Sequence, residues 1–185
     1  MLLITPQHVQ IHRQKVVADV RLNKKRNPSV TVRLNDKVIW HDIPREWHPW
    51  KLAAIDVDGD GAEEFVVALA KFTRHSPHRL HTLFIYGFDG THIYPKWRGS
   101  SMGRDFIDFA VVNSAQSQRL ITLDHLLNGR FAVTCHVWKG FGFEKIWEHG
   151  DWKKARLEVR GNQIKVFTDD GPKLYAANGV SSTKQ

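Results

Sequence analysis

The sequence contains a single cysteine, Cys135, among its 185 residues. One cysteine excludes an internal disulfide framework, so burial and hydrogen bonding have to stabilise the fold. Cys135 lies within the apolar run 131–138. In that setting we expect a small buried side chain and not a reactive nucleophile.

Long apolar runs are missing as well. No run approaches the roughly 20 residues that a helix needs to cross a bilayer, so we expect no transmembrane segment. The first ten residues show no basic stretch followed by an apolar one, and no signal peptide is visible. With 42% hydrophobic and 25% charged residues, the composition is that of a globular protein, and we expect one domain over residues 1–185.

Positive charge exceeds negative charge, and the net charge is +8. Such an excess raises nucleic acid, an acidic glycan or a membrane surface as partners. The basic residues are spread along the chain, apart from the run 24–26 and a looser group of Lys153, Lys154, Arg156 and Arg160. Scattered charge indicates a solvated surface, so the sequence argues against nucleic-acid binding.

Helical periodicity is scarce, and short β-rich runs separated by Gly, Pro, Asn or Asp fill most of the chain. These runs come in groups of four, and the last group is one strand short. The expected strands are 9–12, 15–22, 29–34 and 37–40; 51–57, 64–71, 81–88 and 91–97; 105–112, 119–126, 131–138 and 143–147; and 154–159, 163–168 and 173–177.

A weak internal repeat accompanies this grouping. Three groups end on a tryptophan, at Trp40, Trp97 and Trp147, and the spacing is close to the roughly 40–50 residues of a four-stranded propeller blade. The sequence therefore predicts an all-β, β-propeller-like fold of about four blades. A strand over residues 2–5 would complete the last blade and close the ring. A part of a larger propeller, pairing with a second copy, and a two-sheet sandwich are the alternatives.

Tight turns are expected between strands of these groups. The segments Asn35-Asp36, Phe88-Asp89-Gly90, Gly140-Phe141-Gly142 and Asp169-Asp170-Gly171 consist largely of residues that tolerate a positive φ. A tight hairpin needs such residues.

The segment Asp56-Val57-Asp58-Gly59-Asp60-Gly61-Ala62-Glu63-Glu64 places carboxylates at loop positions 1, 3, 5 and 9. Apolar runs flank it on both sides, so the loop is expected at the tip of a β-hairpin. An EF-hand is excluded, because it needs flanking helices and a glutamate at position 12, where this chain has Val67.

The pattern D-x-D-x-D-G-x-x-[DE] between strands resembles the calcium loops of FG-GAP and VCBS-type repeats. Those repeats build the propellers of integrin α subunits and of many bacterial surface proteins. The segments 86–90 and 139–143 extend the resemblance more loosely. The resemblance implies a propeller that binds cations in its loops, acts in adhesion or protein association without catalysis, and works outside the cytoplasm.

Carried over to this chain, the motif implies one Ca²⁺ site. Asp56, Asp58 and Asp60 would ligate through their side chains, Ala62 through its backbone carbonyl, and Glu64 through the last carboxylate, which in the family is commonly an aspartate. Alternatively, the aspartates cap backbone amides in a glycine-rich turn that holds no ion. The corresponding segment 113–118 has no carboxylate and 160–162 is too short, so we expect a single site.

Three other sets of residues are candidates for binding or catalysis. Trp47 and Trp50 lie in the connection before the acidic loop, where they would stack on a sugar or a proline-rich peptide, or pack over the blade. His75, His78 and His81 are expected in a polar loop and not at a metal site. Asp124-His125 and Ser100-Ser101 lack the sequence context of a hydrolase.

The sequence therefore predicts a non-catalytic interaction or scaffold module with one calcium-stabilised hairpin loop. Its partner would be a protein or a glycan. The first alternative is a carbohydrate- or glycan-binding domain that uses loop tryptophans and basic residues. The second is a hydrolase or lyase that acts on glycans, since propellers also carry such enzymes.

Overall fold

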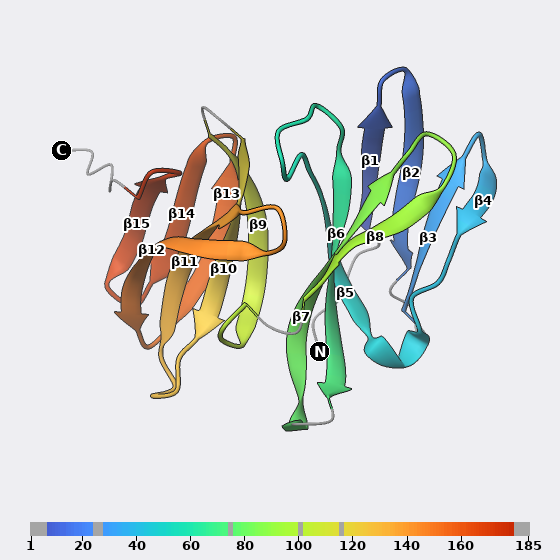
Figure 1. Cartoon of the computed structure of the whole chain (residues 1–185). Helices are drawn as coiled ribbons and strands as arrows, with labels where there is room; N and C mark the ends of the chain where they lie inside the picture. The colour runs from blue at the N-terminus through green and yellow to red at the C-terminus, as the bar shows by residue number, and fades with distance from the viewer. Residues whose placement is uncertain (1–6, 24–27, 74–75, 100–101, 115–116, 180–185) are drawn as a thin grey trace. The chain divides into compact units, whose positions relative to one another are not determined.

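The protein is an all-β chain whose strands form four antiparallel sheets (Figure 1). The computed structural model describes residues 7–23, 28–73, 76–99, 102–114 and 117–179. The strands are β1 (Gln7–Arg13), β2 (Val16–Asn23), β3 (Ser29–Leu34), β4 (Lys37–Trp40), β5 (Pro49–Ile55), β6 (Glu64–Thr73), β7 (Ser76–Phe88), β8 (Ile93–Arg98), β9 (Phe106–Asn113), β10 (Gln118–His125), β11 (Phe131–Trp138), β12 (Phe143–Trp152), β13 (Ala155–Arg160), β14 (Gln163–Thr168) and β15 (Gly171–Ala176).

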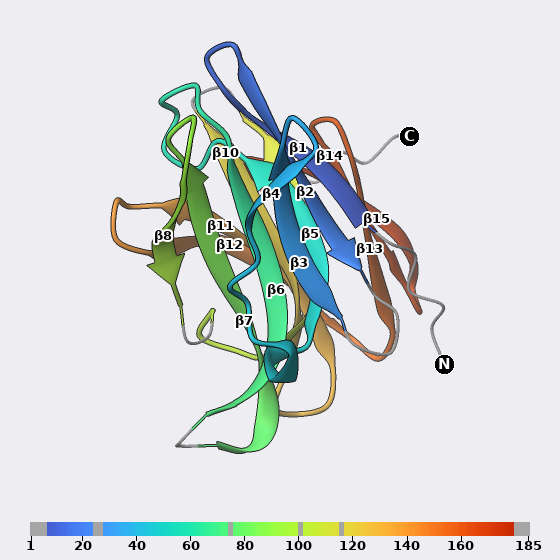
Figure 2. The same cartoon turned by 90° about the vertical axis from the view of Figure 1, so that its right-hand side faces the viewer.

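Each sheet is a meander in which neighbouring strands follow one another along the chain. The orders are β1-β2-β3-β4, β5-β6-β7-β8, β9-β10-β11-β12 and β13-β14-β15, and both views show the hairpins that join them (Figures 1 and 2). This is the topology of propeller blades, and it confirms the predicted all-β, propeller-like class and its four groups. The last sheet has three described strands, as the sequence indicated; the expected closing strand at 2–5 lies outside the described residues.

By its internal contacts the chain divides into two compact units. The first contains residues 1–56 and 60–101, and the second contains residues 57–59 and 102–185. The expectation of a single domain stays a prediction. A 3₁₀ turn over Arg45–Trp47 connects the two sheets of the first unit. In the part of the chain that the structure describes, no helix is long and apolar enough to cross a membrane.

The first unit has a core shared by its two sheets. Alternate residues of β2 and β6 point into it, and Val20, Phe65 and Val67 have no exposed surface. Trp40 packs against Tyr86, with ring centroids 4.7 Å apart, and edge-on against Phe65 at 5.6 Å. The first tryptophan of the sequence repeat is therefore a core residue.

The second unit has its own core. Ile121, Val133 and Cys135 from one sheet join Ile164 and Val166 from the other, all fully buried. Burial raises the pKa of the Cys135 thiol to about 11, so the group stays protonated at neutral pH. The expectation of a small buried side chain is confirmed.

The turn between β3 and β4 shows how local sequence sets the hairpins. Asn35 and Asp36 have φ values of 48° and 63°, the pair of positive angles that a two-residue hairpin turn of this twist requires. Arg33 Nη1 donates a hydrogen bond of 2.7 Å to the Asp36 carbonyl across the turn.

The largest differences from the expected strand boundaries occur at the start of β7 and at the end of β12. The polar loop expected over 75–81 is wrong from Ser76 onward, because β6 extends to Thr73 and pairs with β7 along its whole length, for example Lys71 with Leu80. Strand β12 continues past Trp147 to Trp152. Two register shifts against β11 let it follow its partner further than the local pattern indicated.

We expect the core of the second unit to tolerate truncation poorly. Ile121→Ala removes buried methyl groups and should lower the free energy of unfolding by about 2–5 kcal/mol. Ile146 lies on the same sheet but is 42% exposed, so Ile146→Ala should cost less than about 1 kcal/mol. Urea denaturation of the two variants measures the difference, and equal losses would contradict the assignment of the core.

Candidate functional site: the acidic hairpin loop

The acidic segment connects β5 to β6 at a hairpin tip, as the sequence predicted. Gly59 and Gly61 take φ values of 77° and 80°, which residues with a Cβ rarely adopt. The apolar side chains of Val57 and Ala62 are buried, at 2% and 5% exposure. The loop is therefore anchored by two small apolar contacts, while its glycines allow the backbone to fold back.

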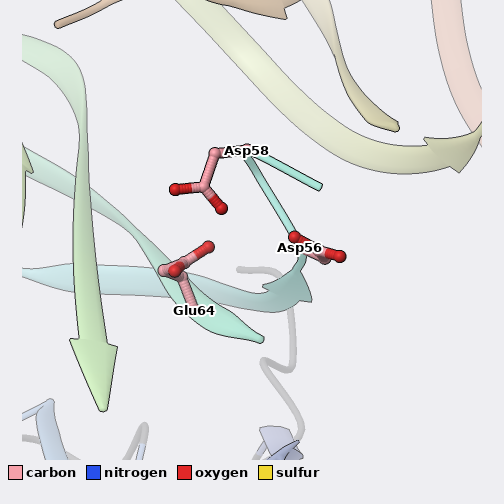
Figure 3. A group of neighbouring side chains, drawn as sticks. All are labelled: Asp56, Asp58 and Glu64. Atoms are coloured by element: carbon pink, nitrogen blue, oxygen red, sulfur yellow. The ribbon is translucent and has the colours of Figure 1, made fainter. Parts of the chain in front are cut away.

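Three carboxylates gather in this loop. One oxygen each from Asp56, Asp58 and Glu64 lies within 4.8 Å of the others. In Figure 3 the Asp58 carboxylate points toward that of Glu64, with Asp56 to the side. Glu64 is buried, Asp56 is half-buried and Asp58 is exposed. Carboxylates this close repel each other unless a positive charge lies nearby.

A lysine supplies part of that charge. Lys96 on β8 places its Nζ 2.6 Å from Glu64 Oε1, and the two side chains are only 17% and 3% exposed. Lys96 therefore compensates part of the negative charge of the three carboxylates. Sequence reasoning missed Lys96, because 32 residues separate it from Glu64 and only strand register brings them together.

Asp60 and Ala62 were also predicted as ligands, and the structure gives them other contacts. Asp60 Oδ1 accepts a 2.8 Å hydrogen bond from the Ala62 backbone N–H, and Asp60 Oδ2 lies 3.2 Å from Arg13 Nη1. The Ala62 N–H and the Arg13 guanidinium hold the pKa of Asp60 below its usual range. Asp56 Oδ2 likewise accepts a bond of 3.0 Å from the Gly61 N–H. Aspartates thus cap backbone amides here, as the alternative interpretation of the loop expected.

Glu63 ties the loop to β1. Its backbone N–H donates to the His12 carbonyl at 3.0 Å, and its Oε2 accepts from the His12 N–H at 3.2 Å. The same carboxylate contacts His12 Nδ1. Glu63 is therefore a structural residue, and the shape of the loop depends on β1 as well as on its own sequence.

Trp47 lies in the 3₁₀ turn, whereas Trp50 lies in strand β5 and not in the expected connection; both pack against their own unit. Trp47 contacts Phe84 edge-on, with ring centroids 5.5 Å apart, and Lys71 Nζ lies 4.8 Å from a Trp47 ring centroid. Trp50 meets His81 at 5.4 Å. Both side chains are half-buried. This arrangement matches packing over the blade, the second of the two roles considered for them.

The second unit contains a buried polar group that the sequence did not indicate. Thr134 Oγ1 donates to Asp124 Oδ2 at 2.5 Å, and Thr122 Oγ1 lies 3.0 Å from His136 Nε2. All four side chains are at most 3% exposed. The sequence signal that could have revealed this group is the two-residue spacing of its members. Successive side chains of a strand alternate between its two faces, so residues 122 and 124 share one face of β10, and residues 134 and 136 share one face of β11. The neighbouring His125 is exposed and packs on Phe131, whereas Asp124 is buried.

Burial controls the protonation of this group. It raises the pKa of Asp124 and lowers the pKa of His136 to about 4, with the Lys145 ammonium adding to the second effect. At neutral pH His136 is thus uncharged and acts as a hydrogen-bonding partner of Thr122.

Comparison with protein-family models finds no match, and comparison with curated proteins finds no relative. The resemblance to FG-GAP and VCBS-type repeats therefore depends on the loop motif and the blade-like repeat alone, and membership of that family stays a prediction.

Removing Lys96 tests the charge balance of the acidic group. Lys96→Met leaves the buried Glu64 carboxylate without its cation and should cost roughly 3 kcal/mol in calcium-free buffer. Lys139→Met is the matched control, since the Lys139–Glu144 pair spans 3.4 Å between exposed side chains and should contribute less than about 1 kcal/mol. Urea denaturation measures both; a neutral Lys96→Met variant would contradict the role given to this pair.

The buried imidazole predicts an acid-sensitive second unit. The His136 pKa is near 4 in the folded chain and 6.5 in the unfolded chain, so the unfolded state binds more protons between these values. Stability is complete above pH 6.5 and falls by up to about 3 kcal/mol as the pH drops toward 4. His136→Gln should lose this contribution, whereas the exposed His41→Gln should keep the wild-type slope. Denaturation curves of the wild type and both variants between pH 4 and 7 measure this dependence of stability on pH. The raised pKa of Asp124 acts in the opposite direction, but Asp124 is present in all three proteins and its effect is the same in each.

Proposed function

We propose that the protein is a non-catalytic interaction module whose β5–β6 loop is clamped by one Ca²⁺ ion. The observation that carries the calcium proposal is the convergence of Asp56, Asp58 and Glu64 on a glycine-containing hairpin tip. Carboxylate oxygens are the ligands that calcium prefers. A divalent cation between the three carboxylates would add to the positive charge that Lys96 places beside Glu64.

Within this proposal the ion has a structural role. Asp58 is exposed and Glu64 is buried, so an ion between them would link the loop tip to the start of β6. Asp60 becomes a further ligand only if its carboxylate releases Arg13. Ala62 becomes one only if its backbone carbonyl points to the ion. Residues 113–118 and 160–162 lack the carboxylates for such a site, so the ion would steady one hairpin.

The partner is proposed to be a protein or a glycan, met outside the cytoplasm, where millimolar calcium would fill even a weak site. Two observations bear on the alternatives. The contacts of Trp47 and Trp50 within their unit give no support to a sugar platform built from these rings. The assignment of Asp124 to a buried hydrogen bond with Thr134 does not favour a glycan hydrolase or lyase at that position.

Calcium titration of metal-stripped protein tests the clamp. We expect binding tighter than roughly 1 mM by calorimetry and a melting temperature that rises with calcium, because the ion binds the folded state. Asp58→Asn should abolish both effects, because it removes one of the three converging carboxylates, and this one is exposed. Glu63→Gln removes a carboxylate of the same loop that faces His12 and should leave calcium binding in place.

Identical melting curves in calcium and in EDTA would contradict the calcium clamp. The loop would then be a turn in which aspartates cap backbone amides and no ion is bound. Asp60→Asn separates the two ligand sets: unchanged calcium affinity restricts the site to Asp56, Asp58 and Glu64, whereas a large loss shows that Asp60 moves from Arg13 to the ion.

A further inference from the structure

A second charged region, of opposite sign, covers one face of the sheet β13-β14-β15 in the second unit (orange to red in Figure 1). The inward face of this sheet carries Leu157, Ile164 and Val166, which belong to the core. The opposite face carries residues that stand directly across from one another on β13 and β14. These pairs are Arg156 with Phe167, Glu158 with Lys165, and Arg160 with Gln163.

The ring of Phe167 contacts two cations on this face. The Arg156 guanidinium carbon lies 4.1 Å from the ring centroid, and Lys165 Nζ lies 4.6 Å from it. A cation over an aromatic face is attracted by the ring quadrupole. This contact holds both groups against the ring without adding a negative charge to the face.

The Glu158 carboxylate forms ion pairs with both Arg156 and Arg160. Glu158 Oε1 lies 2.6 Å from Arg160 Nε, and Glu158 Oε2 lies 3.6 Å from Arg156 Nη1. Lys165 forms no ion pair with a described residue. The face therefore carries three cations against one carboxylate. Exposed ion pairs add little to stability, so folding alone does not account for this concentration of positive charge.

The face is also hollowed. A cavity of about 230 Å³ is lined by Glu158, Arg160, Gln163, Lys165 and Phe167. It is smaller than the roughly 300–1,000 Å³ of a pocket for a drug-sized ligand. One negatively charged sugar unit is of suitable size, with the amide of Gln163 available for a hydroxyl group.

We propose that this face, the Arg156–Phe167 face, binds a sulfate- or carboxylate-bearing polysaccharide. Charge complementarity selects a polyanion. The Phe167 ring is engaged by Arg156 and Lys165 and is not an open platform for bases, on which proteins that bind single-stranded nucleic acid depend. The proposal goes beyond the calcium clamp and needs no metal, because the acidic loop contributes none of these residues.

Heparin binding by the full chain tests the proposal. The triple variant Arg156→Gln, Arg160→Gln, Lys165→Gln should elute from immobilised heparin at clearly lower salt than wild type. The slope of log K against log salt should fall by about 2 to 3, from the loss of released counterions. The control changes three exposed cations of the first unit to Gln, Lys15, Lys37 and Arg45, so that the net charge falls equally. The control should elute close to wild type.

A single substitution gives a result of opposite sign. Glu158→Gln removes the carboxylate that competes for both arginines, so this variant should elute at higher salt than wild type, with an unchanged circular dichroism spectrum. This arm also keeps the proposal testable should the triple variant fold poorly.

Three outcomes would overturn the proposal. Equal salt shifts in the triple variant and the control would show that net charge alone drives retention. Unchanged or weaker retention of Glu158→Gln would show that the carboxylate does not compete with the ligand. Displacement of heparin by single-stranded DNA at a lower concentration than by a free sulfated polysaccharide would assign the face to nucleic acid.

Discussion

The alternation of successive side chains between the two faces of a strand is the constraint on which the rest of this structure depends. In each unit two meanders cover one another with an apolar face and form a shared core. The positions left over point away from that core. The Arg156–Phe167 face consists of such positions, and hairpin tips such as the acidic loop are free of the alternation altogether. The Arg156–Phe167 face is thus a place that packing leaves open, whereas the acidic group combines an exposed Asp58 with a buried Glu64.

Much of the fold follows from local sequence, because strands and tight turns are local features. Alternating residues and the Asn-Asp and Gly turns predicted the strands and their grouping, and the φ values of Asn35 and Asp36 show the turn chemistry at work. The errors occurred where strand pairing overrides the local pattern. Strand β7 begins at Ser76 because β6 continues opposite to it, and β12 runs on to Trp152 because β11 offers it a partner.

The acidic loop could be predicted only as far as its residues are contiguous. Nine consecutive positions indicated where carboxylates would meet, and Asp56, Asp58 and Glu64 do lie together. Their long-range neighbours could not be foreseen, since Lys96 and Arg13 arrive from other strands in a register that the core sets. The basic face was hidden for the same reason. Lys165 and Phe167 are ordinary residues in the sequence until antiparallel pairing places Arg156 across from Phe167.

The lone thiol offers a practical consequence. Cys135 has no exposed surface and a raised pKa, so an alkylating reagent can reach its thiolate only when the second unit opens. Because no other cysteine competes, the rate of labelling reports opening around Cys135. In the regime where closing is faster than alkylation, comparison with the alkylation rate of an accessible thiol gives the free energy of that opening. The chain thus contains a native reporter of opening in the second unit that needs no added label.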